Sequence, residues 1–142
     1  MLVEKATIKN LHCVRFNTGD ELLKGLEDAV KKQGIQNGLI LYGFGSTVNH
    51  HFHVVGNAEI PPENVFEKAD KPSDIVNING AVINGRVHAH IIHSDRKIAY
   101  GGHLEPGVKA LTFCMVFIAE TDQNLGEWDS GGKEVEEKLK KK

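Results

Sequence analysis

The chain has 142 residues, of which 40% are hydrophobic and 25% are charged, a composition typical of a globular domain. Its formal net charge of −2 supplies no general attraction to DNA, whose non-specific affinity depends on neutralised phosphates. No stretch approaches the roughly 20 apolar residues of a membrane-spanning helix, and segment 1–5 starts no apolar signal sequence. We therefore expect a cytoplasmic protein without a membrane partner.

The N-terminal part of the chain predicts a strand, a helix and two further strands. The apolar run at 11–16 predicts the first strand. Asp20 is a candidate N-cap, and apolar residues at helical spacing predict a helix over 20–34. The segment 38–45 predicts a short strand that enters a glycine bend, and 46–55 alternates as another strand. This last strand carries a group of histidines, His50, His51 and His53.

The middle of the chain predicts an antiparallel meander. The segment 57–73 is rich in proline and charge, and we expect it to run over the surface. Two alternating runs, 74–83 and 86–93, are separated by Asn-Gly, which is the strongest short signal for a hairpin. A return strand is expected at 97–104, so the three strands would pair in succession.

The composition of the chain changes after residue 120. The run 110–119 is the most apolar in the sequence and predicts the last strand of the sheet. The segment 121–142 is polar and ends in a charged stretch of helical character, 133–142. We therefore expect one domain over 1–120, followed by a polar C-terminal tail over 121–142 with a charged helical end.

Histidines gather in the predicted hairpin of 86–93 and 97–104. With the turn centred between Asp95 and Arg96, antiparallel pairing sets His103 opposite His88. Alternation of side chains along a strand then collects three imidazoles on one face, while the other face carries apolar residues suited to a core. The three imidazoles belong to His88, His90 and His103.

Three neutral imidazoles on rigid strands form a good site for a divalent metal ion. An unperturbed histidine pKa of about 6.5 leaves most of them free to ligate at neutral pH. A three-histidine set with an open fourth position is typical of catalytic or ligand-binding zinc sites. The sequence therefore predicts zinc or another divalent metal at His88, His90 and His103. The alternative is a set of partly buried polar residues at a subunit contact, and participation of the histidines in 46–55 is left open.

Two short motifs resemble the signature of a known family. Val87-His88-Ala89-His90, followed by Gly101-Gly102-His103-Leu104, is similar to the His-x-His and Gly-Gly-His-Leu motifs of the PPC domain (DUF296) family. Its stand-alone prokaryotic members are often labelled PD1-like DNA-binding proteins. The resemblance covers roughly residues 8–120. It implies a mixed α/β (α+β) fold with a largely antiparallel sheet, one main packed helix and assembly as a homotrimer. It also implies that the three histidines occupy positions where some prokaryotic members bind metal.

These observations leave three hypotheses for function. The first is a cytosolic homotrimeric metal-binding domain in which a small-molecule ligand completes the metal shell. The second is a metal-dependent enzyme acting on a small molecule, with Glu105 and Asp95 as the nearest acids in sequence. The third is a DNA-associated regulatory protein, which the net charge and the absence of an Arg-Gly-Arg hook disfavour.

Overall fold

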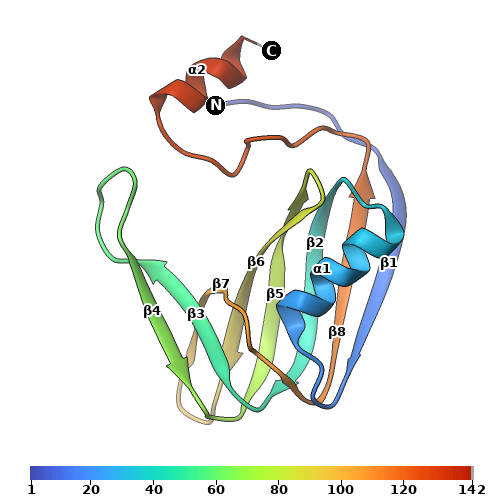
Figure 1. The fold of residues 1–142 in the computed structure, drawn as a ribbon, viewed down its shortest axis with the longest axis vertical. Coiled ribbons are helices and arrows are strands. Elements are labelled where there is room, and N and C mark those ends of the chain that lie inside the picture. Colours follow the sequence, from blue (N-terminus) through green and yellow to red (C-terminus); the bar gives the residue numbers. More distant parts are fainter. Residues whose placement is uncertain (142) are drawn as a thin grey trace.

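Eight strands and two helices follow one another along residues 1–141, the part of the chain that the computed structural model describes. Figure 1 shows their arrangement. In chain order they are β1 (Ile8–Asn17), α1 (Leu22–Gln33), β2 (Asn37–Thr47), β3 (His50–Val55), β4 (Asn64–Ala69), β5 (Ser73–Ile83), β6 (Arg86–Ser94), β7 (Ala99–Leu104), β8 (Ala110–Thr121) and α2 (Lys133–Lys140). Within residues 1–141, no helix is both long enough and apolar enough to cross a membrane.

The eight strands form one antiparallel sheet in the order β1-β8-β2-β5-β6-β7-β3-β4. This confirms the expected α+β fold with a large antiparallel sheet. The predicted meander is present as β5, β6 and β7. Asn84 and Gly85 connect β5 to β6, and both have positive φ, as a two-residue hairpin turn of this kind requires.

Two local features differ from expectation. The segment 57–73 runs over the surface as expected, but it also contains β4, an edge strand that pairs with β3 alone among the strands of residues 1–141. Nearly all side chains of β4 are exposed, so no buried face marked it in the sequence. The N-cap of α1 is Glu21, whose carboxylate accepts a hydrogen bond from the Lys24 amide at 2.9 Å. Asp20 instead accepts from the Asn17 amide at 2.7 Å and so closes the turn before the helix.

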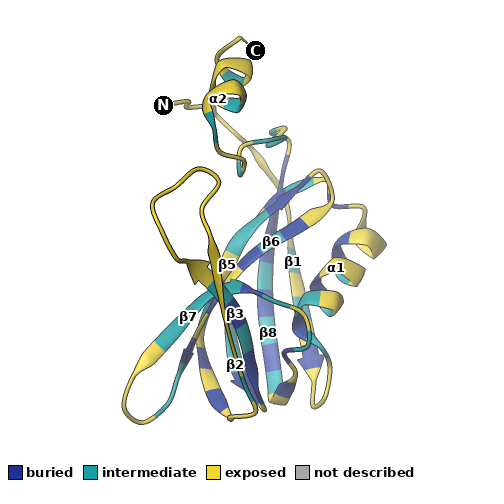
Figure 2. Ribbon diagram, turned by 60° about the vertical axis from the view of Figure 1, so that its left-hand side comes forward, coloured by how far each residue is buried: buried dark blue, intermediate teal, exposed yellow. Residues whose placement is uncertain are grey.

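Helix α1 covers one face of the sheet, as Figures 1 and 2 both show. Leu22, Leu26 and Val30 lie at a spacing of four residues and are buried in a single core cluster with apolar residues from the strands. Gly25 faces the Phe16 ring of β1, where an added Cβ would lie 2.4 Å from a ring carbon. The missing side chain therefore lets α1 pack close to β1.

The opposite face of the sheet, which we call the open face, is covered by no helix of residues 1–141. Side chains that alternate away from α1 on β2 and β5 remain substantially exposed, although they are apolar: Leu39, Leu41, Tyr42 and Val76. Strand β8 shows the same asymmetry, because Val116 and Ile118 are buried while Phe117 is only half-buried. Exposed apolar side chains that gather on one face of a protein can mark an interaction site.

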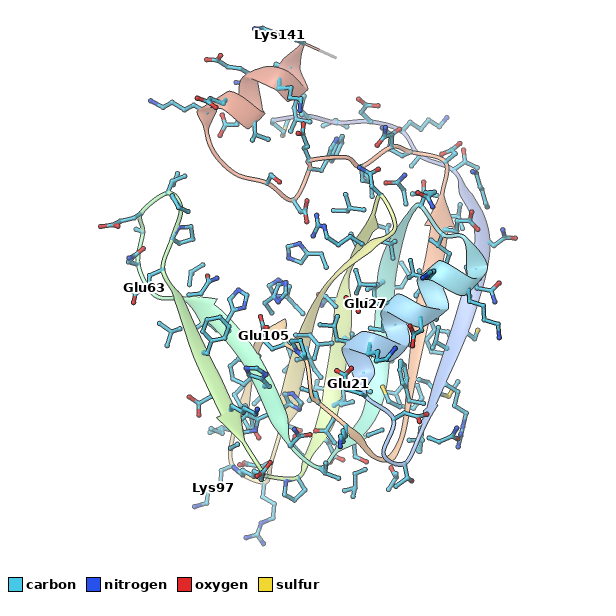
Figure 3. The ribbon with its side chains drawn as sticks, in the orientation of Figure 1. Glu21, Glu27, Glu63, Lys97, Glu105 and Lys141 are labelled. Atoms are coloured by element: carbon cyan, nitrogen blue, oxygen red, sulfur yellow. The ribbon has the colours of Figure 1, made fainter. Side chains whose placement is uncertain are left out.

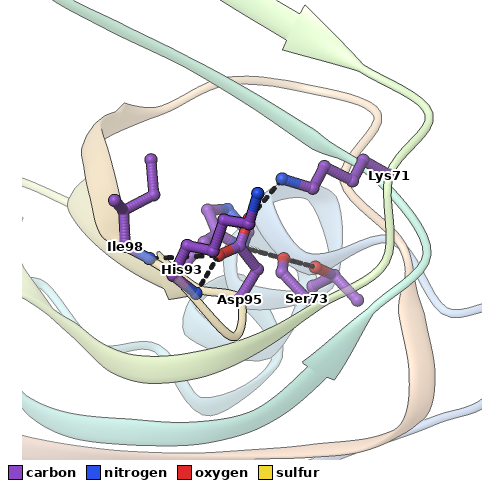
Figure 4. A network of polar contacts seen from close by, with 7 residues as sticks. Lys71, Ser73, His93, Asp95 and Ile98 are labelled. Carbon is purple, nitrogen blue, oxygen red and sulfur yellow. Dashed lines mark hydrogen bonds and ion pairs between the residues drawn. The ribbon is translucent and has the colours of Figure 1, made fainter.

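A buried polar network lies at the end of the molecule near the β6–β7 turn (Figure 4). His93 of β6 has no exposed surface, and its Nδ1 lies 3.0 Å from the Ser73 hydroxyl and 3.3 Å from the Thr47 hydroxyl. Lys71 pairs with Asp95 beside it. Burial, reinforced by the nearby His50, lowers the pKa of His93 to about 4, because a charged imidazole would lose its hydration there.

Two consecutive glycines in β7 permit close pairing on both sides of that strand. An added Cβ on Gly101 would lie 1.9 Å from the Ile91 carbonyl oxygen in β6, and one on Gly102 would lie 2.2 Å from the His53 carbonyl oxygen in β3. Such distances are far inside van der Waals contact. A side chain at either position would therefore force the neighbouring strand away.

The depressed pKa of His93 predicts a loss of stability in mild acid. The pKa of His93 is about 4 in the folded protein and about 6.5 in the unfolded chain. The contribution of His93 to the free energy of unfolding is therefore complete above about pH 6.5 and declines as the pH falls toward about 4. Between about pH 7.5 and about pH 5 the contribution falls by about 2 kcal/mol. In chemical denaturation, His93→Gln should lose less free energy of unfolding across this interval than the wild-type protein. Equal losses would contradict the prediction, since the other histidines are common to both proteins.

Substitution of Gly102 by alanine should destabilise the sheet where β7 meets β3. The free energy of unfolding of Gly102→Ala should fall by about 2 kcal/mol, the usual cost of forcing extra atoms into a packed site, because the new methyl group meets the His53 carbonyl. Gly131→Ala is the matched control, since nothing lies near its added Cβ. If the two variants unfold at the same denaturant concentration, the close approach of β7 and β3 is not required for stability.

Candidate metal centre

Four imidazoles from three neighbouring strands gather on the open face. His88 and His90 come from β6, His103 from β7 and His53 from β3. The register pairs His90 with His103 and His103 with His53. The ring centroid of His103 lies 4.5 Å from that of His53, 4.9 Å from that of His88 and 5.6 Å from that of His90. We refer to these four residues as the histidine cluster.

The pairing predicted for the hairpin was wrong by two residues. His103 lies opposite His90 rather than His88, and Ser94 pairs with Ala99. The cause is the turn, in which the Asp95 carboxylate accepts hydrogen bonds from the amides of Lys97 and Ile98 at 2.7 and 3.1 Å. Because the shift is even, every side chain keeps its face. The structure therefore brings His88, His90 and His103 together as expected, while their binding of a metal stays a prediction.

Strand order decides which of the other histidines reach this cluster. β3 pairs with β7, which places His53 beside His103. His50 points to the other side and is buried beside Phe52 and His93, whereas the Nδ1 of His51 lies 2.8 Å from the Pro106 carbonyl oxygen. Only one of the three histidines in 46–55 therefore joins the cluster, and no local pattern in the sequence distinguishes it from His51.

A carboxylate also reaches the histidine cluster. The Glu105 Oε1 atom lies 2.6 Å from the His53 Nδ1 and 3.3 Å from the His103 Nδ1. Figure 3 shows Glu105 within the body of the molecule, between the ends marked by Lys97 and Lys141. Alternation beyond Leu104 keeps Glu105 on the same face as His103, and the chain stays paired at this point because the Glu105 amide donates to the His51 carbonyl at 3.1 Å.

A second carboxylate approaches from the C-terminal segment. The Asp129 Oδ2 atom lies 2.8 Å from the His88 Nδ1 and 2.7 Å from an Arg86 guanidinium nitrogen. Burial opposes ionisation of Asp129, but the hydrogen bonds from His88 and Arg86 outweigh it and hold its pKa below the usual value. Nothing in the sequence signalled this contact, because Asp129 lies in the glycine-rich tail.

The surroundings keep the central imidazoles neutral. Burial lowers the pKa of His103, and the neighbouring His53 and His88 add to the effect, while Glu105 opposes it. Burial likewise lowers the pKa of His90, with further contributions from His88 and His53. A neutral imidazole is the form that ligates a metal ion. Both imidazoles are therefore in the neutral form at neutral pH.

The donor atoms suit a divalent ion such as zinc. One ligand atom each from His53, His103 and Glu105 falls within 4.8 Å of the others, and imidazole nitrogen with carboxylate oxygen is a donor set that zinc accepts. The His103 Nδ1 is buried and makes no hydrogen bond within the described residues. His103 belongs both to this set and to the set expected from the sequence, so it is the residue that the two sets share.

Comparison with known proteins identifies a family from the sequence and a shared fold from solved structures. The sequence model of the Plants and Prokaryotes Conserved (PCC) domain matches residues 3–122. A search among curated proteins found no match. Several solved structures share the fold, and at sequence identities near one fifth they show the fold alone.

Three of these structures are informative. A metal-containing protein from Archaeoglobus fulgidus has a TM-score of 0.75 at 21% identity, covering 87% of this chain and 88% of that chain. A plant- and prokaryote-conserved (PPC) protein from Pyrococcus horikoshii has a TM-score of 0.72 at 21% identity, with 87% of each chain covered. Acetolactate decarboxylase from Bacillus subtilis subspecies spizizenii has a TM-score of 0.54 at 18% identity, covering 83% of this chain and 54% of that one.

The family match extends over most of the chain and includes both the His-x-His motif and the Gly-Gly-His-Leu motif, whose histidines meet in the cluster. The resemblance noted in the sequence is therefore confirmed. The chain belongs to the Plants and Prokaryotes Conserved (PCC, or PPC) domain family.

Proposed function

We propose that the histidine cluster binds a divalent metal ion, zinc or an ion with similar ligand preferences, and that a small-molecule ligand completes its coordination. The observation that carries the proposal is the convergence of four imidazoles and the Glu105 carboxylate around His103. An ion held by three protein ligands keeps a coordination position for a further ligand. The role of the protein is thus to present a metal-bound small molecule on the open face.

Three observations support this proposal. The imidazoles lie on paired strands, which hold donor atoms more rigidly than loops do. The lowered pKa values of His90 and His103 favour the ligating form. A protein of the same fold from Archaeoglobus fulgidus is described as metal-containing, and we extend that property to this chain as part of the proposal.

Two ligand sets compete within the cluster. One consists of His88, His90 and His103, and the other of His53, His103 and Glu105. In the second set, the same Glu105 oxygen lies near the Nδ1 atoms of both histidines. The sets predict different losses of affinity on mutation, so an experiment can decide between them.

His103→Ala should abolish metal binding, because this residue belongs to both sets. Untagged wild-type protein should contain stoichiometric zinc after chelator-free purification, and zinc affinity should fall by more than about 100-fold in the variant, beyond the range of an outer-shell change. His12→Ala, on β1, is the matched control and should retain the metal. Two double variants then identify the ligand set. Zinc affinity should fall in His88→Ala/His90→Ala if the first set binds the metal, and in His53→Ala/Glu105→Gln if the second set does. The proposal would be contradicted if the folded wild-type protein contained no metal and also bound no zinc on titration.

We propose further that the chain assembles as a homotrimer through the apolar part of the open face, which lies on β2, β5 and β8. The family resemblance implies a trimer, and exposed apolar side chains lie on this part of the open face. Tyr42 stacks on Phe44 with ring centroids 5.8 Å apart, and Phe44 meets Phe113 edge-on at 6.0 Å. Aromatic residues of this kind are enriched at interfaces between subunits.

Light scattering coupled to size exclusion tests this assembly. The wild-type protein should have the mass of three chains, and Tyr42→Asp should reduce that mass because an unpaired charge would be buried at the contact. Ile98→Asp is the control, since Ile98 is also exposed but lies in the β6–β7 turn. A monomeric wild-type protein, or a variant of unchanged mass, would show that the open face does not form the interface.

A further inference from the structure

Asp129 contacts the histidine cluster from a part of the chain that the family match does not include. The match ends at residue 122, and Asp129 lies between β8 and α2. Its side chain is only 13% exposed, and its Oδ2 atom contacts both the His88 imidazole and the Arg86 guanidinium. The C-terminal segment thus supplies a carboxylate to a site whose imidazoles all come from the sheet.

The local structure around Asp129 holds it in place. The Leu125 amide donates to the Asn37 side-chain oxygen at 3.1 Å, which ties the segment to the start of β2. The Trp128 amide donates to the Leu125 carbonyl at 3.0 Å, and the Ser130 amide donates to the Glu127 carbonyl at 3.1 Å. Two successive turns therefore place Asp129 against β6. Figures 1 and 2 show this segment leaving the sheet at the end where α2 lies.

The contact selects one form of the His88 imidazole. A neutral imidazole carries a single N–H, on Nδ1 or on Nε2, and an ionised carboxylate only accepts hydrogen bonds. The Asp129 Oδ2 atom also accepts a hydrogen bond from the Arg86 guanidinium at 2.7 Å, as an ionised carboxylate paired with arginine does. The 2.8 Å contact therefore places the proton on Nδ1 and leaves the Nε2 lone pair free. A carboxylate in this position commonly orients a histidine that binds a metal.

We propose that Asp129 is a positioning residue, which fixes the tautomer of His88 so that its Nε2 serves as a metal ligand. The inference rests on the proposed function and adds the C-terminal segment to the site. Arg86 has a supporting part, because its guanidinium shares the Asp129 Oδ2 atom and favours the ionised carboxylate. The segment after the sheet is thus a component of the site in this chain.

Asp129→Asn tests the inference in the full-length protein. The asparagine amide can donate as well as accept a hydrogen bond, so it no longer excludes the tautomer with the proton on Nε2. Asp122→Asn is the matched control, because it makes the same chemical change in a residue whose carboxylate accepts from the Thr7 amide. NMR of the imidazole nitrogens reports the His88 tautomer without metal, and competition with a chromogenic chelator reports zinc affinity.

We expect the wild-type protein and Asp122→Asn to hold the His88 proton on Nδ1, and Asp129→Asn to lose that preference. Zinc affinity should fall about 10- to 100-fold in Asp129→Asn alone. Unchanged tautomer and affinity would overturn the role of Asp129 while leaving the metal site intact. Equal weakening in both variants would also overturn it, because the effect would be one of net charge. Absence of zinc binding by the wild-type protein would instead overturn the proposed function, and the metal role of Asp129 with it.

Discussion

The backbone pairing of β7 with both β6 and β3 is the constraint on which the histidine cluster depends. Gly101 and Gly102 present only hydrogen where a Cβ would overlap the carbonyl oxygens of Ile91 and His53. Glycine in a strand costs conformational entropy and offers no side chain to pack. Glycine nevertheless occupies two consecutive positions of β7. As a result, His103 has a histidine-bearing strand on each side.

Strand β6 divides its side chains between the core and the site. Val87, Ala89 and Ile91 are buried on the side that α1 covers, while His88 and His90 alternate to the open face. The geometry of the imidazoles is therefore set by the same apolar packing that stabilises the sheet. This arrangement explains why the pKa values of His90 and His103 are lowered, since the neighbours of these two residues are paired strands and further imidazoles.

Sequence reasoning succeeded where alternation alone was enough and stopped where strand order was needed. His88 and His90 could be placed on one face because a strand has a period of two, and the even error in the hairpin register left that placement unchanged. His53 could not be assigned, because its contact with His103 depends on β3 pairing with β7. β4 was missed because its exposed side chains carry no core pattern. The contact of Asp129 with His88 depends on turns and tertiary packing that no periodicity encodes. Trimer assembly stays a prediction, and DNA association stays the alternative that the net charge disfavours.

The distances along the chain between the cluster residues bear on how the site forms. Within the cluster only His88 and His90 are close in sequence, while His53 and His103 meet through strand pairing across a long segment that contains β4, β5 and β6. Bringing such distant parts of the chain together carries an entropic cost that native contacts must offset, and a fold rich in long-range contacts forms more slowly than one built from local contacts. The unfolded chain therefore has little more than a pair of neighbouring imidazoles. The complete cluster belongs to the folded sheet as a whole and appears or disappears with it, unlike a loop-borne site that can open by local fluctuation.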